Sequence, residues 1–152
     1  MPMTIQTNSV RETEAAGAAL AAQLKAGDVV AFFGGLGMGK TAFVRGMARG
    51  MGLDAHMVSS PTFALVHEYG GRPPLVHFDM YRISGWDDLY STGFFEYLDG
   101  GAVLAVEWSE NVEGALPAGT IRVQFTRVDD HTRKIDIEYP RRTADDRPGA
   151  SD

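Results

Sequence analysis

The chain contains no cysteine, so it can form neither a disulfide framework nor a cysteine-ligated metal site. This absence suits a reducing compartment, and we expect the protein to be cytoplasmic. Positive charge is also scarce, because 14 Lys and Arg stand against 20 Asp and Glu, which gives a formal net charge of -6. Proteins that grip nucleic acid by themselves usually present a basic face, so we expect no direct binding of RNA or DNA.

Long apolar runs are missing as well. No stretch approaches the ~20 apolar residues that span a bilayer, and residues 1–14 lack the apolar core of a signal peptide. We therefore expect neither a membrane segment nor export. The 44% hydrophobic and 22% charged residues are typical of an ordinary globular chain. We expect one domain over residues 1–140, followed by a polar, disordered tail at 141–152.

The clearest motif lies between an apolar run at residues 28–33 and a segment of helical spacing at residues 40–51. Its eight residues match G-x-x-x-x-G-K-[ST] at every fixed position, and they are Gly34, Gly35, Leu36, Gly37, Met38, Gly39, Lys40 and Thr41. A chance glycine-rich turn is the alternative, but it would not require a buried strand before it and a helix after it. The sequence therefore predicts a phosphate-binding loop.

The chemistry of such a loop assigns a role to each part. Glycines let successive backbone N–H groups turn inward around phosphates, and the helix N-terminus adds its positive dipole end. Lys40 would bridge the β- and γ-phosphates, and the Thr41 hydroxyl would coordinate magnesium. Because the chain has no Asn-Lys-x-Asp guanine signature, we expect ATP with Mg²⁺ as the nucleotide.

A triphosphate site also needs a carboxylate near magnesium, at the end of a buried strand. Glu107 follows the apolar run 102–106, and Asp79 follows residues 75–78. We favour Glu107 for the magnesium shell because its run is the more completely apolar, and Asp79 would orient the attacking water or share the metal. Either residue could instead be a solvated acid at a strand end. Thr62 lies where a switch-like loop could touch the γ-phosphate.

Tyr81, Arg82, Trp108 and the histidines are less informative. Tyr81 and Arg82 could reach the same site, although an Arg at a strand end is usually a surface charge. Trp108 could be a packing aromatic or a partner contact. The four histidines, at 56, 67, 77 and 131, have no metal-ligand spacing, so we expect them to be structural.

The remaining pattern predicts strands and helices around the loop. A capping box at Ser9 and Glu12 begins a first helix, whose apolar stripe reaches Leu24 and which Gly27 ends. Residues 86–98 suit a short helix that Gly93 interrupts. The expected strands are 3–7, 28–33, 63–69, 75–81, 102–106, 121–128 and 133–139, with hairpins at 63–81 and 121–139. The fold class is therefore α/β, a P-loop NTPase-like three-layer sandwich with a mainly parallel central sheet carrying antiparallel hairpins.

Taken in order, GGLGMGKT, then SSPTF with LVHEY, then HFDMYR, then the pair Glu107-Trp108 resemble the bacterial TsaE family, formerly called YjeE. The resemblance covers residues 5–125. It implies a small P-loop ATPase that works with TsaB and TsaD to form threonylcarbamoyladenosine at adenosine 37 of tRNAs that read ANN codons. In the family, TsaE docks on the TsaB–TsaD complex near the nucleotide site and its ATP hydrolysis supports repeated turnover.

The resemblance also implies residue roles. Lys40 and Thr41 hold phosphate and magnesium, Glu107 belongs to the metal shell, and Asp79 belongs to the hydrolytic machinery. Thr62 gains the switch-like role that spacing leaves open. Arg82 and Trp108 become site or partner residues. Adenine would lie between the N-terminal segment and the C-terminal hairpin, at Asn8, Ser9 and Arg133.

Two positions depart from the family pattern. Gly35 stands where the family usually has Asp, and Ala42 stands where it has a second Thr. Gly35 removes a carboxylate near the phosphates, and Ala42 leaves only its backbone N–H for the α-phosphate. Because the backbone cradle, Lys40 and Thr41 remain, nucleotide binding should survive. The hydrolysis rate is the property these departures put in question.

Two other functions are compatible with a phosphate loop. A small P-loop kinase would need an acceptor pocket and a lid of clustered arginines, and Arg122, Arg127 and Arg133 lie on a predicted hairpin without such clustering. A nucleotide-gated binding protein would need Lys40 but not the two carboxylates. The sequence does not determine the partner interface, the oligomeric state or which acid contacts magnesium.

Overall fold

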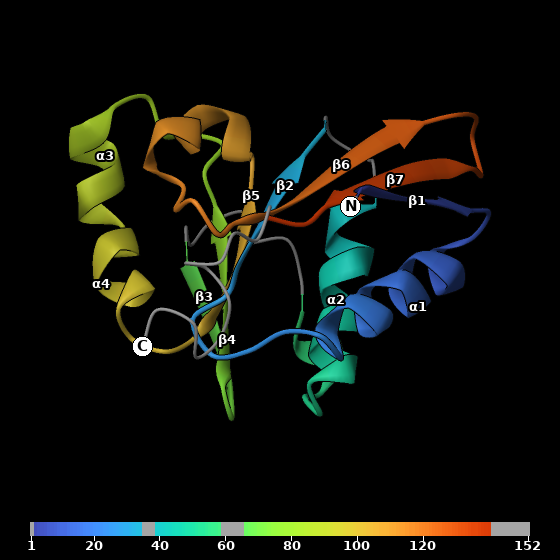
Figure 1. Cartoon of the computed structure of the whole chain (residues 1–152), viewed down its shortest axis with the longest axis horizontal. Helices are drawn as coiled ribbons and strands as arrows, with labels where there is room; N and C mark the ends of the chain where they lie inside the picture. Colours follow the sequence, from blue (N-terminus) through green and yellow to red (C-terminus); the bar gives the residue numbers. More distant parts are fainter. Residues whose placement is uncertain (1, 35–38, 59–65, 141–152) are drawn as a thin grey trace.

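The computed structural model describes residues 2–34, 39–58 and 66–140, and it contains a seven-stranded mixed sheet with helices on both faces (Figure 1). The strand order is β1-β7-β6-β2-β5-β4-β3. The strands are β1 (Pro2–Thr7), β2 (Val29–Phe33), β3 (Val66–Gly71), β4 (Pro74–Asp79), β5 (Val103–Glu107), β6 (Ile121–Arg127) and β7 (Arg133–Glu138). The helices are α1 (Val10–Ala21), α2 (Lys40–Gly50), α3 (Trp86–Ser91) and α4 (Phe94–Leu98), with 3₁₀ segments η1 (Ala55–Met57) and η2 (Ser109–Ala115).

The centre of the sheet is parallel and its edges are antiparallel. β2 pairs with β5 and β6 in parallel, and β5 pairs with β4 in parallel. The pairs β1–β7, β6–β7 and β3–β4 are antiparallel. Every residue of β2 and β5 is buried, as both faces of these strands are covered by helices. The expected fold class is confirmed, and the two apolar strands β2 and β5 are neighbours in the sheet.

Two hydrophobic cores fill the space on either side of the sheet. Helices α1 and α2 cover one face, and α3, α4 and η2 cover the other (Figure 1). The alternation of a strand divides its side chains between them, so Val30 and Phe32 of β2 join the α1–α2 core while Val29 joins the other. This arrangement fixes which strand-end side chains face α2.

The contact between α1 and α2 depends on two glycines. A Cβ added at Gly46 would lie 1.8 Å from the carbonyl oxygen of Glu14, and one added at Gly17 would lie 2.1 Å from that of Phe43. No real side chain tolerates such distances, so the two backbones approach as closely as they do only because these positions are glycine. The approach brings the start of α1 next to the phosphate loop.

The structure differs from the sequence expectations mainly at element ends. The strand expected to reach Tyr81 ends at Asp79, because the Tyr81 N–H donates to Asp79 Oδ1 at 2.9 Å and the chain turns there. The first helix ends at Ala21, although Leu24 still packs against the core. The interruption at Gly93 is confirmed, with a φ of 81°. The expected tail at 141–152 lies outside the described residues.

None of the helices in the described part of the chain has the length and apolar character that a bilayer crossing requires.

Candidate functional site

The phosphate loop has the strand and helix that its sequence predicted. β2 ends at Phe33, and α2 begins at Lys40. Gly34 has a φ of 126° and Gly39 a φ of 97°, backbone conformations that residues with a Cβ rarely adopt. The described ends of the loop therefore require the two glycines at which they occur. Residues 35–38 lie outside the described part of the chain.

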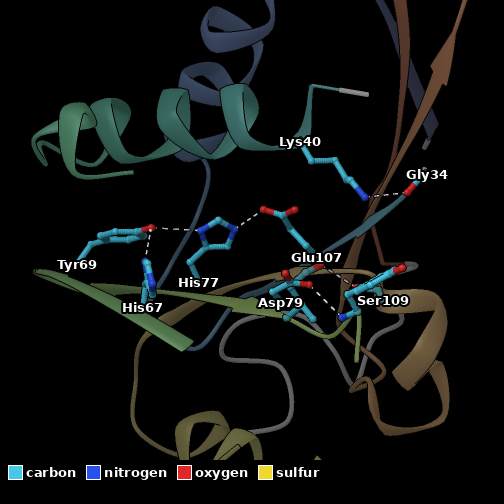
Figure 2. Close-up of polar contacts among 10 residues, drawn as sticks. Gly34, Lys40, His67, Tyr69, His77, Asp79, Glu107 and Ser109 are labelled. Atoms are coloured by element: carbon cyan, nitrogen blue, oxygen red, sulfur yellow. Dashed lines mark hydrogen bonds and ion pairs between the residues drawn. The ribbon is translucent and has the colours of Figure 1, made fainter. Parts of the chain in front are cut away.

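Lys40 is a nearly buried cation at the start of α2. Only 5% of the residue is exposed, and its Nζ donates to the Gly34 carbonyl oxygen at 2.7 Å (Figure 2). Burial lowers the pKa of the ammonium group, whereas the nearby carboxylates of Glu107, Glu110 and Asp79 act in the opposite direction. Thr41 follows it and is partly exposed, whereas Ala42 is buried. A dry cation beside a phosphate loop is suited to an anionic ligand.

Glu107 and Asp79 lie in register on neighbouring parallel strands, at their carboxyl ends. This is the same edge of the sheet at which β2 leads into the loop, the usual ligand-binding edge of a parallel sheet. Glu107 is 4% exposed. Burial raises the pKa of the Asp79 carboxyl, and the charge of Glu107 adds to that shift, while the Tyr81 N–H lowers the pKa. The structure therefore brings Lys40 and both predicted acids together.

His77 is the main residue at this site that the sequence reasoning missed. Its side chain is fully buried, and its Nε2 lies 2.5 Å from Glu107 Oε2. Its Nδ1 lies 3.3 Å from the Tyr69 hydroxyl, which lies 3.4 Å from His67 Nδ1 (Figure 2). His77 was expected to be structural, and one sequence signal indicates its position. His77 precedes Asp79 by two residues on a strand and therefore lies on the same face.

Trp108, which follows Glu107 in the chain, contacts both Lys40 and Tyr81. Its ring lies 4.4 Å from Lys40 Nζ and 4.9 Å, between centroids, from the Tyr81 ring. Its φ of 59° is a left-handed conformation that is uncommon for a residue with a side chain. The sequence left open whether Trp108 is a packing aromatic or a partner contact, and in the structure it packs against Lys40. Arg82 is exposed and makes no hydrogen bond or ion pair with another described residue.

Glu110 was also missed by sequence reasoning. Its Oε2 accepts a hydrogen bond from the Gly34 N–H at 2.9 Å, so η2 is tied to the first residue of the loop. The next residue, Asn111, donates through Nδ2 to the carbonyl oxygens of Met80 and Tyr81 at 2.8 and 3.1 Å. η2 thus contacts both the loop and the turn after Asp79.

The three residues assigned to an adenine region lie together. Thr7 pairs with Arg133 between β1 and β7, and Thr132 Oγ1 donates to Asn8 Oδ1 at 3.1 Å. Ser9 caps α1 through a bond from the Glu12 N–H. In the first turns of that helix, Thr13 Cγ2 lies 3.6 Å from where a Cβ on Gly39 would be. This group is therefore next to the described end of the loop.

The remaining predicted site residues, Gly35 to Met38 and Thr62, lie outside the described residues. Within the described residues, no three His, Asp or Glu side chains are grouped so as to hold a metal ion. Magnesium in nucleotide sites usually needs fewer protein ligands, because phosphate oxygens and waters complete its shell. One or two carboxylates and a threonine hydroxyl therefore fit Mg²⁺ together with a nucleotide.

Comparisons with known proteins agree with this geometry. The family described as "Threonylcarbamoyl adenosine biosynthesis protein TsaE" matches residues 7–135. The chain is 35% identical over 135 residues to the TsaE protein of Treponema pallidum, covering 89% of this chain and 99% of that relative. It is 39% identical over 131 residues to the TsaE protein of Bacillus subtilis, covering 86% of this chain and 81% of that relative.

The crystal structure of Bacillus subtilis YdiB has a similar fold, with a TM-score of 0.75 and 33% sequence identity. The similarity covers 93% of this chain and 87% of YdiB. The phosphate-loop fold, the family match and these relatives together establish that the chain belongs to the TsaE family of tRNA threonylcarbamoyladenosine biosynthesis proteins.

Proposed function

We propose that this chain is a magnesium-dependent ATPase required, with TsaB and TsaD, for forming threonylcarbamoyladenosine at adenosine 37 of tRNAs that read ANN codons. The observation that carries the proposal is the nearly buried Lys40 ammonium, which lies between the phosphate loop and two strand-end carboxylates. The carboxylates and the Gly34 carbonyl oxygen already face this cation. The phosphates of a nucleoside triphosphate would supply further negative charge beside it.

Each side chain then has a defined task. Lys40 would leave the Gly34 carbonyl and neutralise phosphate charge, and the loop N–H groups would cradle the phosphates. Thr41 and Glu107 would hold Mg²⁺, with Asp79 orienting the attacking water or sharing the metal. When bound, the metal would neutralise charge that develops on the phosphate oxygens. Positioning and charge stabilisation would supply most of the rate acceleration, as is usual for phosphoryl transfer.

His77 acts in this scheme as a positioning residue for Glu107. An ionised carboxylate can only accept hydrogen bonds, so with Glu107 ionised the proton of His77 lies on Nε2. The His77 Nδ1 then accepts from the Tyr69 hydroxyl, which fixes the ring. Partners of this kind orient carboxylates toward metals, and their loss usually costs activity.

The arginines on the β6–β7 hairpin argue against a kinase. Arg122 pairs with Glu113 and Arg127 pairs with Asp130, while Arg133 donates to backbone carbonyl oxygens. Committed to these contacts, they do not form the free arginine cluster that clamps a transferred phosphate. Hydrolysis by water is therefore the favoured reaction. The acidic chain would leave contact with tRNA to its partners, and one cytoplasmic domain would suffice for this role.

The test is the threonylcarbamoyladenosine content of tRNA from cells that lack this protein and have no paralogue. Mass spectrometry of digested tRNA should show loss of the modification, restored by the unchanged gene and not by Lys40→Ala. If the chain were instead a nucleotide-gated binding protein, Glu107→Gln would also restore the modification. Normal modification in the deleted cells would overturn the proposed function.

A further inference from the structure

Three aromatic side chains, Trp86, Tyr90 and Phe95, form a cluster on α3 and α4, here called the aromatic cluster. Trp86 is 56% exposed and Tyr90 is 61% exposed. The rings of Trp86 and Phe95 are stacked with centroids 6.3 Å apart, and those of Tyr90 and Phe95 are 5.0 Å apart. Grouped exposed aromatics on a globular protein mark interaction surfaces, and Trp and Tyr are enriched among residues that dominate binding energy.

A groove of about 470 Å³ adjoins the aromatic cluster, between the start of α3 and η2. Trp86 lines the groove, so the two features form one continuous face. The buried side chains of Ile83, Leu89 and Val112 give the groove an apolar lining. Figure 1 shows α3 next to the helical turn that follows β5, on the side of the sheet away from α1 and α2. Such a groove accepts an apolar side chain of a partner.

The charge of this face has one sign. Residues 83–121 contain no Lys, Arg or His, and their exposed acids are Asp87, Asp88, Glu96, Asp99, Glu110 and Glu113. Glu113 pairs with Arg122, but the described residues provide no ion pair for Asp87, Glu96 or Glu110. The surface around the aromatic rings is therefore negative and open to cations from outside.

We propose that the aromatic cluster and its groove dock a partner protein through a basic segment, with an apolar side chain in the groove and Lys or Arg beside it. An arginine can stack on Trp86 while pairing with a neighbouring carboxylate. RNA is disfavoured because its phosphates would meet these acids. A symmetric contact with a second copy is disfavoured because it would bring acids against acids.

The groove is physically connected to the nucleotide site. Glu110 lines the groove and accepts the Gly34 N–H, while Asn111 holds the carbonyl oxygens of Met80 and Tyr81. A cation entering the groove would compete with Gly34 for the Glu110 carboxylate. This inference rests on the proposed function, since it gives the partner of that ATPase a surface from which it can act on the loop.

The experiment measures binding of purified TsaB–TsaD complex to the full-length chain by calorimetry. Trp86→Ala with Tyr90→Ala should weaken binding by about tenfold or more. Asp87→Lys with Glu96→Lys should weaken it too, and the affinity of the unchanged chain should fall as salt rises. Met3→Ala and Glu138→Lys, on β1 and β7 at the opposite edge of the sheet, are the matched controls and should bind normally. ATP binding should be unaffected in all of these variants.

The outcomes separate the inference from the proposed function. If the unchanged chain binds TsaB–TsaD and both surface variants bind equally well, the docking face is wrong while the ATPase proposal stands. If the unchanged chain does not bind the complex, the partner proposal and the docking face fall together. Two other results would overturn the inference. If the chain forms a dimer that dissociates on Trp86→Ala with Tyr90→Ala, the face belongs to a second copy. If removal of residues 141–152 improves binding, the face belongs to the chain's own tail.

Discussion

The Nε2 atom of His77 lies 2.5 Å from Oε2 of Glu107, and both side chains are buried beneath α2 (Figure 2). Neither group can turn to water if the other is removed, so the orientation of the carboxylate depends on the imidazole. Glu107 points toward the space between His77 and Lys40. We therefore expect His77 to affect hydrolysis through Glu107.

Replacing His77 with Ala should lower kcat for ATP hydrolysis by about 10- to 100-fold with little change in ATP affinity. His77→Gln should recover part of the rate, because its amide N–H can still reach Glu107. Steady-state kinetics of both variants separate positioning from simple loss of folding. Equal kcat values for His77→Ala and the unchanged chain would remove His77 from the mechanism.

Asp79→Asn should stabilise the fold at pH 7 while it impairs hydrolysis. Burial raises the pKa of the Asp79 carboxyl above its ordinary value of 3.8, so ionisation is harder in the folded chain than in the unfolded chain. The ionised carboxylate therefore destabilises the folded state above its raised pKa, and this effect disappears below the ordinary value. Melting temperatures should show a gain for Asp79→Asn at pH 7 that disappears below pH 3.8. The same measurement on exposed Asp87→Asn should show almost no gain at either pH.

Gly46→Ala should destabilise the protein by about 1–3 kcal/mol or more, because its Cβ would lie 1.8 Å from the Glu14 carbonyl oxygen. The helices α1 and α2 would have to separate, which would also move Thr13 away from Gly39. Urea unfolding measures the change in free energy. Gly119→Ala is the control, since nothing lies within 4 Å of its added Cβ. Equal stability of the two variants would contradict the close helix contact.

Trp108 should report nucleotide binding by fluorescence. Lys40 Nζ now lies 4.4 Å from its ring centroid, and phosphates would draw that ammonium away. Addition of Mg·ATP should therefore change the emission of the unchanged chain and of Trp86→Phe, but not that of Trp108→Phe. A signal that survives Trp108→Phe would place the responding tryptophan on α3 instead.

The sequence predicted the parts of this protein that depend on local pattern. The apolar runs of β2 and β5 and the fixed positions of the glycine-rich motif each reflect one dominant requirement, burial or a special backbone conformation. The positions of Asp79 and Glu107 at the edge of the sheet were predicted for the same reason, because each stands at the end of an apolar run. Family membership followed from the order of these motifs.

The contacts at the site that escaped prediction join residues far apart in the chain. His77 and Glu107 are 30 residues apart, and Glu110 and Gly34 are 76 apart, so no local spacing relates them. The strand expected to continue to Tyr81 stopped at Asp79 because one side-chain bond turned the backbone. The aromatic cluster was missed for a different reason, since its apolar residues fit a core helix equally well until their exposure is known.

The most direct test of the proposed function is ATP hydrolysis by the purified chain, measured with and without purified TsaB and TsaD. We predict slow hydrolysis by the chain alone, clear stimulation by the two partners together, and loss of the stimulated rate in Glu107→Ala while ATP binding is retained. Hydrolysis that the partners leave unchanged, or a stimulated rate that survives Glu107→Ala, would contradict the proposed function.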